Sequence, residues 1–176
     1  MENTELLRYP IGKFKYDPAV KNIGKDMERL LALPATLRSA VNGLSDAQLD
    51  TAYRQGGWTL RQVVHHLPDS HMNAYIRFKL AITEENPIIR TYKENIWAEC
   101  KEARFGDILI SLNLLSALHI RWVEFLKSLN EDDFERTYHH PEHNKNIKLK
   151  EVLNMYAWHG EHHLGHILQT RNRLGM

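Results

Sequence analysis

The sequence predicts an all-α protein built as a four-helix bundle, with short extra helical turns and an extended N-terminal arm. Four long segments repeat apolar residues at intervals of three and four, the spacing that places side chains on one face of a helix. No segment shows the sustained alternation that is typical of strands. The chain has 176 residues, of which 43% are hydrophobic and 26% charged. This composition is ordinary for a globular protein, so we expect a single domain over residues 1–176.

The N-terminal arm is predicted from residues 1–16, which contain Pro10, Gly12 and aromatic residues alternating with lysines. The aromatic side chains are expected to hold this arm against the body of the protein. The first long helix is predicted to start at Asp17 and Pro18, because aspartate is a preferred N-cap residue and proline suits the first helical position.

The apolar residues of this first helix keep helical spacing. They are Val20, Ile23, Met27, Leu30, Leu31, Leu37 and Val41. Pro34 lies within this pattern, and we expect it to kink or locally break the helix because proline removes a backbone donor. Asn42-Gly43 is a typical helix end.

Two capping boxes mark the starts of the next helices. In a capping box a Ser or Thr side chain and a Gln or Glu side chain three residues later satisfy each other's backbone donors. Ser45 with Gln48 predicts a short helical turn, and Thr59 with Gln62 predicts the start of the second long helix. The apolar face of that helix continues to Ile82, over roughly six or seven turns.

The second half of the chain contains two more long helices. Residues 88–104 form a long connection before them, and connections of this length are often functional. The third long helix is predicted from about 108 to 129, and Asn130 is expected to cap a short turn. Residues 138–144 are predicted as a polar turn region. The last helix is predicted from about 149 to near 173.

Composition excludes several classes of protein. The formal net charge is +1, which gives no bulk electrostatic reason to expect nucleic acid or an anionic membrane as a partner. Cys100 is the only cysteine, which excludes an internal disulfide and a cysteine-rich zinc site. The N-terminus has no signal pattern, and no apolar run is judged to approach membrane-spanning length. We therefore expect a cytoplasmic protein.

The strongest functional signal is the segment 158–166, which holds four of the eleven histidines. His159 and His163 are four residues apart and lie one above the other on a helix face. Two imidazoles one turn apart can hold a divalent metal ion. Such pairs also arise by chance, but the density of histidines favours a metal site here. Two ligands do not hold a metal tightly, so we expect a third from elsewhere in the chain.

Candidates for the third ligand lie in the second long helix. Periodicity favours His71, which lies in the middle of the apolar face. His66 lies on the flank of that face, and His65 is predicted to point furthest from the core. From the residues alone, the choice between His71 and His66 stays open.

Several motifs carry a family resemblance. They are Gly57-Trp58-Thr59-Leu60-Arg61-Gln62-Val63-Val64-His65-His66-Leu67, Asp69-Ser70-His71-Met72-Asn73, Arg8-Tyr9-Pro10-Ile11-Gly12, Asp50-Thr51 with Tyr53-Arg54, and Trp158-His159 with His162-His163 and His166. Together these motifs resemble the DinB/YfiT-like superfamily, and closely its YfiT branch, over nearly the whole chain.

The resemblance implies a four-helix bundle that holds one divalent metal ion through three histidines. One ligand in the family is the histidine directly before the leucine of the second helix, which carries over to His66. The other two come from the last helix and carry over to His159 and His163. His71 then has a role beside the site. Zinc is the expected ion, with nickel as the alternative. Pro68 departs from the family pattern and is expected to bend the helix near the site.

Three histidines leave a coordination position open, which is typical of catalytic sites. A metal ion there can activate water for hydrolysis or a thiol for S-transfer. The resemblance favours a thiol S-transferase or conjugate-processing enzyme, with bacillithiol as the thiol and a small electrophile or conjugate as the substrate. The alternatives are a metal-dependent hydrolase of an amide or ester and a non-catalytic bundle stabilised by metal. Family habit, together with Trp97 and Trp158 as candidates for exposed aromatic residues, makes a homodimer a candidate assembly, which no sequence feature demonstrates.

Other polar residues are candidates for roles near the metal. Asp69 and Asn73 follow His66 and are candidates for ordering its free nitrogen or a bound water, although plain surface residues are more common. His71 and His119 are candidates for a catalytic role, and His119 for a proton carrier, against the usual case of a hydrogen-bonded core histidine. Arg77 is a candidate to neutralise a carboxylate on the thiol, whereas most arginines are solvated or ion-paired.

Overall fold

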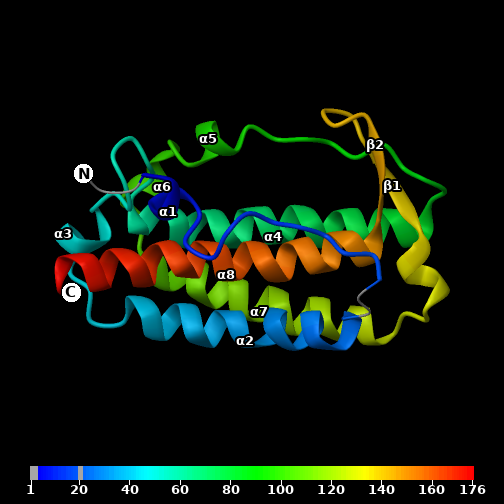
Figure 1. Cartoon of the computed structure of the whole chain (residues 1–176), viewed down its shortest axis with the longest axis horizontal. Helices are drawn as coiled ribbons and strands as arrows, with labels where there is room; N and C mark the ends of the chain where they lie inside the picture. Colours follow the sequence, from blue (N-terminus) through cyan, green and yellow to red (C-terminus); the bar gives the residue numbers. More distant parts are fainter. Residues whose placement is uncertain (1–3, 20–21) are drawn as a thin grey trace.

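The predicted four-helix bundle is confirmed by the computed structural model, which describes residues 4–19 and 22–176. The four long helices lie side by side along the length of the molecule (Figure 1). Within the described residues they are α2 (Ile23–Val41), α4 (Leu60–Thr83), α7 (Ile108–Lys127) and α8 (Leu149–Leu174). The shorter elements are α1 (Thr4–Arg8), α3 (Asp46–Leu49), α5 (Glu94–Trp97), α6 (Lys101–Phe105), the 3-10 helix η1 (Asp132–Glu135), β1 (Thr137–His140) and β2 (Lys145–Lys148).

The buried apolar residues of the described chain form two separate clusters. One contains Phe78, Trp122 and Leu153, and the other contains Leu67 and Leu115. A layer of histidines lies around the boundary of the two clusters along α4, α7 and α8. We call it the histidine layer, and its members are His66, His71, His119, His159 and His163. The candidate site is therefore positioned in the middle of the bundle.

Both predicted capping boxes are present. The Ser45 side chain accepts a hydrogen bond from the backbone N–H of Gln48 at the start of α3, and the Gln48 side chain accepts one from the backbone N–H of Ser45. Thr59 and Gln62 make the same pair of bonds at the start of α4. These local interactions fix where α3 and α4 begin, so the sequence signal is a reliable marker of both helix starts.

Pro34 does not break α2, which continues from Ile23 to Val41 and ends at Asn42. Proline lacks the N–H that would bond to the carbonyl four residues earlier, here that of Leu30. The His119 ring fills this gap, since its Nδ1 lies 2.6 Å from the Leu30 oxygen. The expected local break is therefore absent, and a side-chain hydrogen bond from α7 takes the place of the missing backbone bond. Likewise, α4 runs without interruption through Pro68. A kink at Pro34 stays a prediction.

The start of the chain differs from the prediction in two ways. The arm is not wholly extended, because α1 forms around the buried side chain of Leu7. α2 begins at Ile23 rather than at Pro18, since Asp17 accepts a hydrogen bond from the backbone N–H of Ala19 within a turn. Val20, predicted as the first apolar position of this helix, lies outside the described residues.

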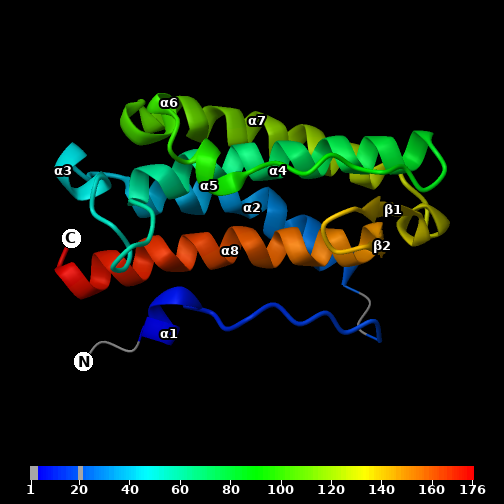
Figure 2. The same ribbon diagram turned by 90° about the horizontal axis from the view of Figure 1, so that it is seen from above.

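The arm runs beside α8, as Figure 2 shows. The predicted contacts of its aromatic residues are present for two of them. Tyr9 packs against His162 with ring centroids 6.0 Å apart, and Phe14 packs against Trp158 at 5.6 Å. Trp158 is therefore partly buried, which weakens the basis for predicting a homodimer, while Trp97 is 40% exposed.

The region predicted as a polar turn contains a small hairpin. β1 and β2 pair antiparallel, with Thr137 opposite Lys148, and only residues 141–144 form the turn. Tyr138 is 1% exposed and belongs to the apolar core, whereas its neighbours are less buried. The strand was missed because it is short and has a histidine on its inner face at His140.

The expectation that no apolar run approaches membrane-spanning length is wrong for α7. Within the described part of the chain, α7 is long and apolar enough by length and composition to cross a membrane, with a mean hydropathy of 1.3. Here α7 packs along α2 and α4, and its inner face carries the buried polar residues Ser111 and His119. α7 is thus an apolar helix that packs against the other helices of the bundle.

Candidate metal centre

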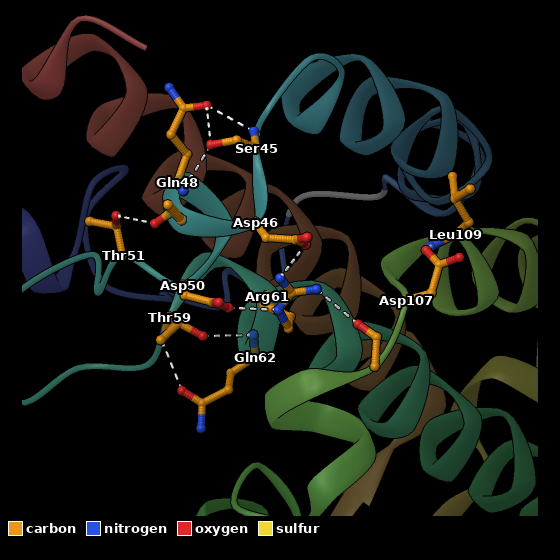
Figure 3. A network of polar contacts seen from close by, with 12 residues as sticks. Ser45, Asp46, Gln48, Asp50, Thr51, Thr59, Arg61, Gln62, Asp107 and Leu109 are labelled. Atoms are coloured by element: carbon orange, nitrogen blue, oxygen red, sulfur yellow. Dashed lines mark hydrogen bonds and ion pairs between the residues drawn. The ribbon is translucent and has the colours of Figure 1, made fainter.

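The start of α4, which carries His66 nearly two turns later, is held by a network around Arg61 (Figure 3). The Arg61 guanidinium donates to the carboxylates of Asp50 at 2.6 Å and Asp46 at 2.7 Å, and to the carbonyl of Gly106 at 2.9 Å. Arg61 is 5% exposed, so these bonds are partly shielded from water. They tie the first turn of α4 to α3 and to the residues that precede α7, and this fixes the position of the helix.

Three histidines meet where α4 faces α8. One ligand nitrogen each from His66, His159 and His163 lies within 4.8 Å of the others. The Nε2 atoms of His66 and His159 are 3.3 Å apart. Two imidazoles on one tetrahedral zinc ion, with Zn–N bonds of about 2.0–2.1 Å, place their nitrogens about 3.4 Å apart. The arrangement therefore fits a divalent ion, and it groups the three residues that the resemblance indicated.

The three rings are available as neutral ligands. Burial lowers the pKa of His66 to about 4. Burial, followed by the charges of neighbouring histidines, lowers the pKa of His159 and His163 well below the ordinary value. A neutral imidazole carries the lone pair that a metal ion requires, so these rings need not lose a proton at neutral pH before they bind one.

The three histidines line a cavity of about 360 Å³. Its walls come from the N-terminal arm, the loop before α4, α5 and α8. The other lining residues are Arg8, Tyr9, Tyr53, Arg54, Gly56, Gly57, Trp58, Glu94, Asn95, Trp158, His162 and His166. Two arginines and one carboxylate thus border a space that is otherwise rich in aromatic rings. Glu94 is an exposed residue, and partial desolvation raises the pKa of its carboxyl group.

His71 lies behind the cluster rather than within it. Its Nε2 is 3.1 Å from Nδ1 of His159, and its Nδ1 is 2.9 Å from Nε2 of His119. Both His71 and His119 have no exposed surface, and burial lowers the pKa of His119 to about 4. The residue that periodicity favoured as a ligand therefore contacts a candidate ligand, His159, at that ligand's ring nitrogen Nδ1.

The remaining histidines of the two motifs have separate partners. His65 was predicted to point furthest from the core, but it is 7% exposed and its Nδ1 lies 2.7 Å from the Ser111 hydroxyl. His162 stacks on Trp158 with centroids 4.6 Å apart. His166 stacks on Tyr53 at 4.0 Å, and its Nε2 lies 3.2 Å from the carbonyl of Arg8, to which it donates. His162 and His166 thus help to hold the cavity wall.

The other predicted site residues lie outside the set that lines the cavity. Asn73 donates to the backbone carbonyl of Asp69 at 2.9 Å. Desolvation, with a smaller effect of Glu102, raises the pKa of Asp69 to about 6. Arg77 is 8% exposed and donates to the carbonyl of Arg90 at 3.2 Å. Catalytic roles for Asp69 and Asn73 and a carboxylate-binding role for Arg77 stay predictions.

Several lining residues were not assigned a role from the sequence. Arg8 and Arg54 belong to motifs that carry the family resemblance, and Glu94 belongs to the long connection 88–104. The length of that connection was the available signal for Glu94. The arginines could not be placed from periodicity because they lie in an arm and a loop.

The stability of the metal-free protein should fall as the pH drops from about 6.5 toward 4. A histidine with a folded-state pKa near 4, such as His119, binds a proton more readily in the unfolded chain. The stabilisation that the neutral His119 ring gives to the folded state is complete above pH 6.5. Below that pH, the free energy of unfolding falls by about 1.4 kcal/mol per pH unit. Urea unfolding at pH 7 and pH 5 measures this loss. His119→Gln should reduce the loss of unfolding free energy between pH 7 and pH 5.

Together, the fold and the cluster define the class of protein: a four-helix bundle with a candidate divalent-metal site formed by histidines from two long helices. The chain belongs to the DinB superfamily, whose family model matches residues 29–167.

Similar proteins cover almost the whole chain. A Bacillus subtilis protein named "Putative metal-dependent hydrolase YfiT" is 47% identical over 171 residues, which is 96% of each chain. A protein of Oceanobacillus iheyensis with the same functional name is 51% identical over 168 residues, covering 94% of this chain and 96% of its own. The solved structure of YfiT from Bacillus subtilis matches with a TM-score of 0.94 and 46% identity, covering 97% of this chain and 98% of that one.

Proposed function

We propose that this protein is a metal-dependent enzyme that transfers a small-molecule thiol, with bacillithiol as the thiol. The observation that carries the proposal is the three-histidine cluster in the wall of a cavity that also presents Arg8 and Arg54. The names of the relatives support a metal-dependent enzyme. A divalent ion, when bound by three imidazoles, supplies a Lewis acid that lowers the pKa of a thiol or water at its open position.

The walls of the cavity favour a thiol that comes from solution and carries negative charge. Cys100, the only cysteine, is exposed and does not line the cavity. Arg8 and Arg54 lie at the border of the cavity and are suited to bind a carboxylate of the thiol through charge-assisted hydrogen bonds. Trp58 and Trp158 offer apolar surface to the electrophile.

The transfer is a simple substitution. The thiol loses its proton to solvent or to a base, and the sulfur forms a bond to the electrophilic carbon of the second substrate. The bond between that carbon and its leaving group breaks, and the leaving group departs with the electron pair. The residues of the chain orient the two substrates within the cavity.

Hydrolysis of an amide or ester is the second candidate, and one further observation favours it. Glu94 lines the cavity, and its pKa is raised by the loss of solvent. A carboxylate whose pKa is nearer neutrality is a more effective general base for a water nucleophile. In this reading, water takes the place of the thiol and the same three histidines hold the metal.

Turnover with and without thiol separates these two candidates. Tag-free protein loaded with one zinc ion per chain is given bacillithiol and a fluorogenic alkylating electrophile, and separately a panel of esters and amides without thiol. The proposal expects metal-dependent conjugation that requires the thiol. Ester or amide turnover without thiol would instead establish the hydrolase. Tight metal binding with neither activity would indicate a metal-stabilised bundle.

The arginines provide a test of thiol recognition. Arg54→Gln should raise the KM for bacillithiol about tenfold, the value of a charge-assisted hydrogen bond, and should leave the KM for uncharged 2-mercaptoethanol unchanged. Arg38→Gln is the matched control, because Arg38 is an exposed arginine on α2 that bonds to Asn113. An equal effect of Arg54→Gln on both thiols would contradict a role in binding the carboxylate.

The setting of the reaction follows from its chemistry. A free thiol substrate and the exposed Cys100 both stay reduced in the cytoplasm, so we propose that the enzyme acts there as a protein without nucleic-acid or membrane partners. A homodimer stays part of the proposal, and light scattering of the metal-loaded protein measures it.

A further inference from the structure

Three histidines, of which His71 and His119 are buried and His159 is half-buried, connect the candidate metal site to a helix that holds no histidine of its own. The connection runs from His159 on α8 through His71 on α4 and His119 on α7 to the carbonyl of Leu30 on α2. The three distances are 3.1, 2.9 and 2.6 Å in that order. His71, His119 and Leu30 have no exposed surface, so water does not compete for the two bonds that join them.

The hydrogen bond to α2 fixes which atom donates in each bond of this series. A carbonyl oxygen only accepts, so Nδ1 of His119 must carry a proton and donate it to Leu30. This carbonyl is available because Pro34, four residues later, has no N–H to offer it. Burial keeps the His119 ring neutral at pH 7, since it lowers its pKa to about 4. A neutral ring has one proton, so Nε2 of His119 is left as an acceptor.

The same reasoning extends to the metal site one ring at a time. Nε2 of His119 accepts, so Nδ1 of His71 must donate to it, and Nε2 of His71 then has a lone pair. Nδ1 of His159 must in turn donate to that lone pair. The only nitrogen of His159 left without a proton is Nε2, the atom that lies 3.3 Å from Nε2 of His66.

We propose that His71 and His119 are positioning residues that hold His159 in the tautomer whose Nε2 faces the metal with its lone pair. The Leu30 carbonyl, which Pro34 leaves without a backbone donor, determines which nitrogen donates and which accepts in each of these hydrogen bonds. The inference rests on the metal site of the proposed function but not on the reaction that occurs there. Neither His71 nor His119 is assigned to proton transfer, because this series of hydrogen bonds ends at a buried carbonyl oxygen, which does not take up a proton.

The ring tautomers of the metal-free protein provide the first test. Nitrogen-15 NMR of histidine-labelled wild-type protein at pH 7 should show protonated Nδ1 and unprotonated Nε2 on His71, His119 and His159. Single histidine variants assign the signals. A proton on Nε2 of any of these three rings in the wild-type protein would overturn the proposed direction, and this measurement requires neither metal nor substrate.

Zinc affinity, measured by competition with a chelator, provides the second test. His119→Leu removes both ring nitrogens and should weaken zinc binding by about 10–100-fold, the usual effect of a lost outer partner of a ligand histidine. His119→Gln should restore binding to near the wild-type value, because its amide can donate to Leu30 and accept from His71. The His159 tautomer should be single in His119→Gln and mixed in His119→Leu.

A matched control separates positioning from general loss of stability. Leu112→Ala removes a buried side chain from the same helix, and Leu112 belongs to the apolar cluster beside the histidine layer. This variant should lose stability but keep the zinc affinity and the His159 tautomer of the wild type. The proposal is overturned if folded His119→Leu binds zinc as tightly as the wild type, or if Leu112→Ala weakens binding equally. A protein that passes these tests but fails to transfer a thiol contradicts only the proposed reaction.

Discussion

His159→Ala is expected to abolish both metal binding and activity. His159 contributes one of the three clustered ligand nitrogens, and its ring also donates to His71. The variant loses a direct ligand and leaves the lone pair of His71 Nε2 without its donor. We expect zinc affinity to fall by more than the 10–100-fold that typifies outer-partner substitutions, that is, by more than about 100-fold. Metal analysis of tag-free protein should show about one ion per wild-type chain and almost none in the variant.

The control for this experiment is another histidine that lies away from the cavity. His143 is exposed in the turn of the hairpin and stacks on His140. His143→Ala should retain the full metal content and the full rate of thiol conjugation. If His159→Ala keeps its metal, the assignment of the ligands is wrong. If it loses metal and the wild type shows no thiol-dependent turnover, the site stands and the reaction must be sought among hydrolyses.

Gly160→Ala is expected to destabilise the protein even though alanine favours helices. Gly160 lies on α8 next to His159, and a Cβ there would lie 2.3 Å from Cδ2 of Leu33 on α2. Leu33 is 4% exposed, so it has little room to move. Overpacking of this kind costs about 1–3 kcal/mol, against about 1 kcal/mol that alanine gains in helix propensity. With an overlap this severe we expect a net loss of about 2 kcal/mol and a Tm lower by about 4–8 °C.

A second glycine and a double variant test this explanation. Gly24 also lies in a helix, but a Cβ there would meet nothing within 4 Å, so Gly24→Ala should not lower the Tm. Leu33→Ala should make room for the new methyl group, and Gly160→Ala should then cost less in that background than in the wild type. Equal costs in both backgrounds would show that the contact with Leu33 is not the cause.

The long helices could be predicted because their determinants are local. Apolar spacing and two capping boxes are readable in short windows, and the structure shows α4 starting directly after Thr59. The short elements depend on contacts from elsewhere. α1 has Leu7 as its buried residue, and the hairpin is held by the burial of Tyr138 against distant parts of the chain. No local pattern carries that information.

The site was predictable in part for the same reason. His159 and His163 follow from their spacing on one helix, whereas the choice of His66 over His71 needed the family resemblance. Periodicity favours His71 because it identifies the most buried face, and His71 is indeed fully buried. A ligand has to border the cavity instead, at the flank of that face. The link from Pro34 to His119 joins residues 85 positions apart, so only the fold reveals it.

The histidine layer around the boundary of the two apolar clusters also has a consequence for the axial alignment of the helices. If one helix slid by a single turn along its neighbours, a histidine would enter an apolar cluster without a partner and a leucine would face the polar layer. Buried polar groups without partners are costly, so misaligned arrangements are penalised. A buried asparagine fixes the register of a coiled coil in the same way. Leucine at both His71 and His119 would give a continuous apolar core in which several alignments have similar energies, so the residues that orient the metal site also select one register for the bundle.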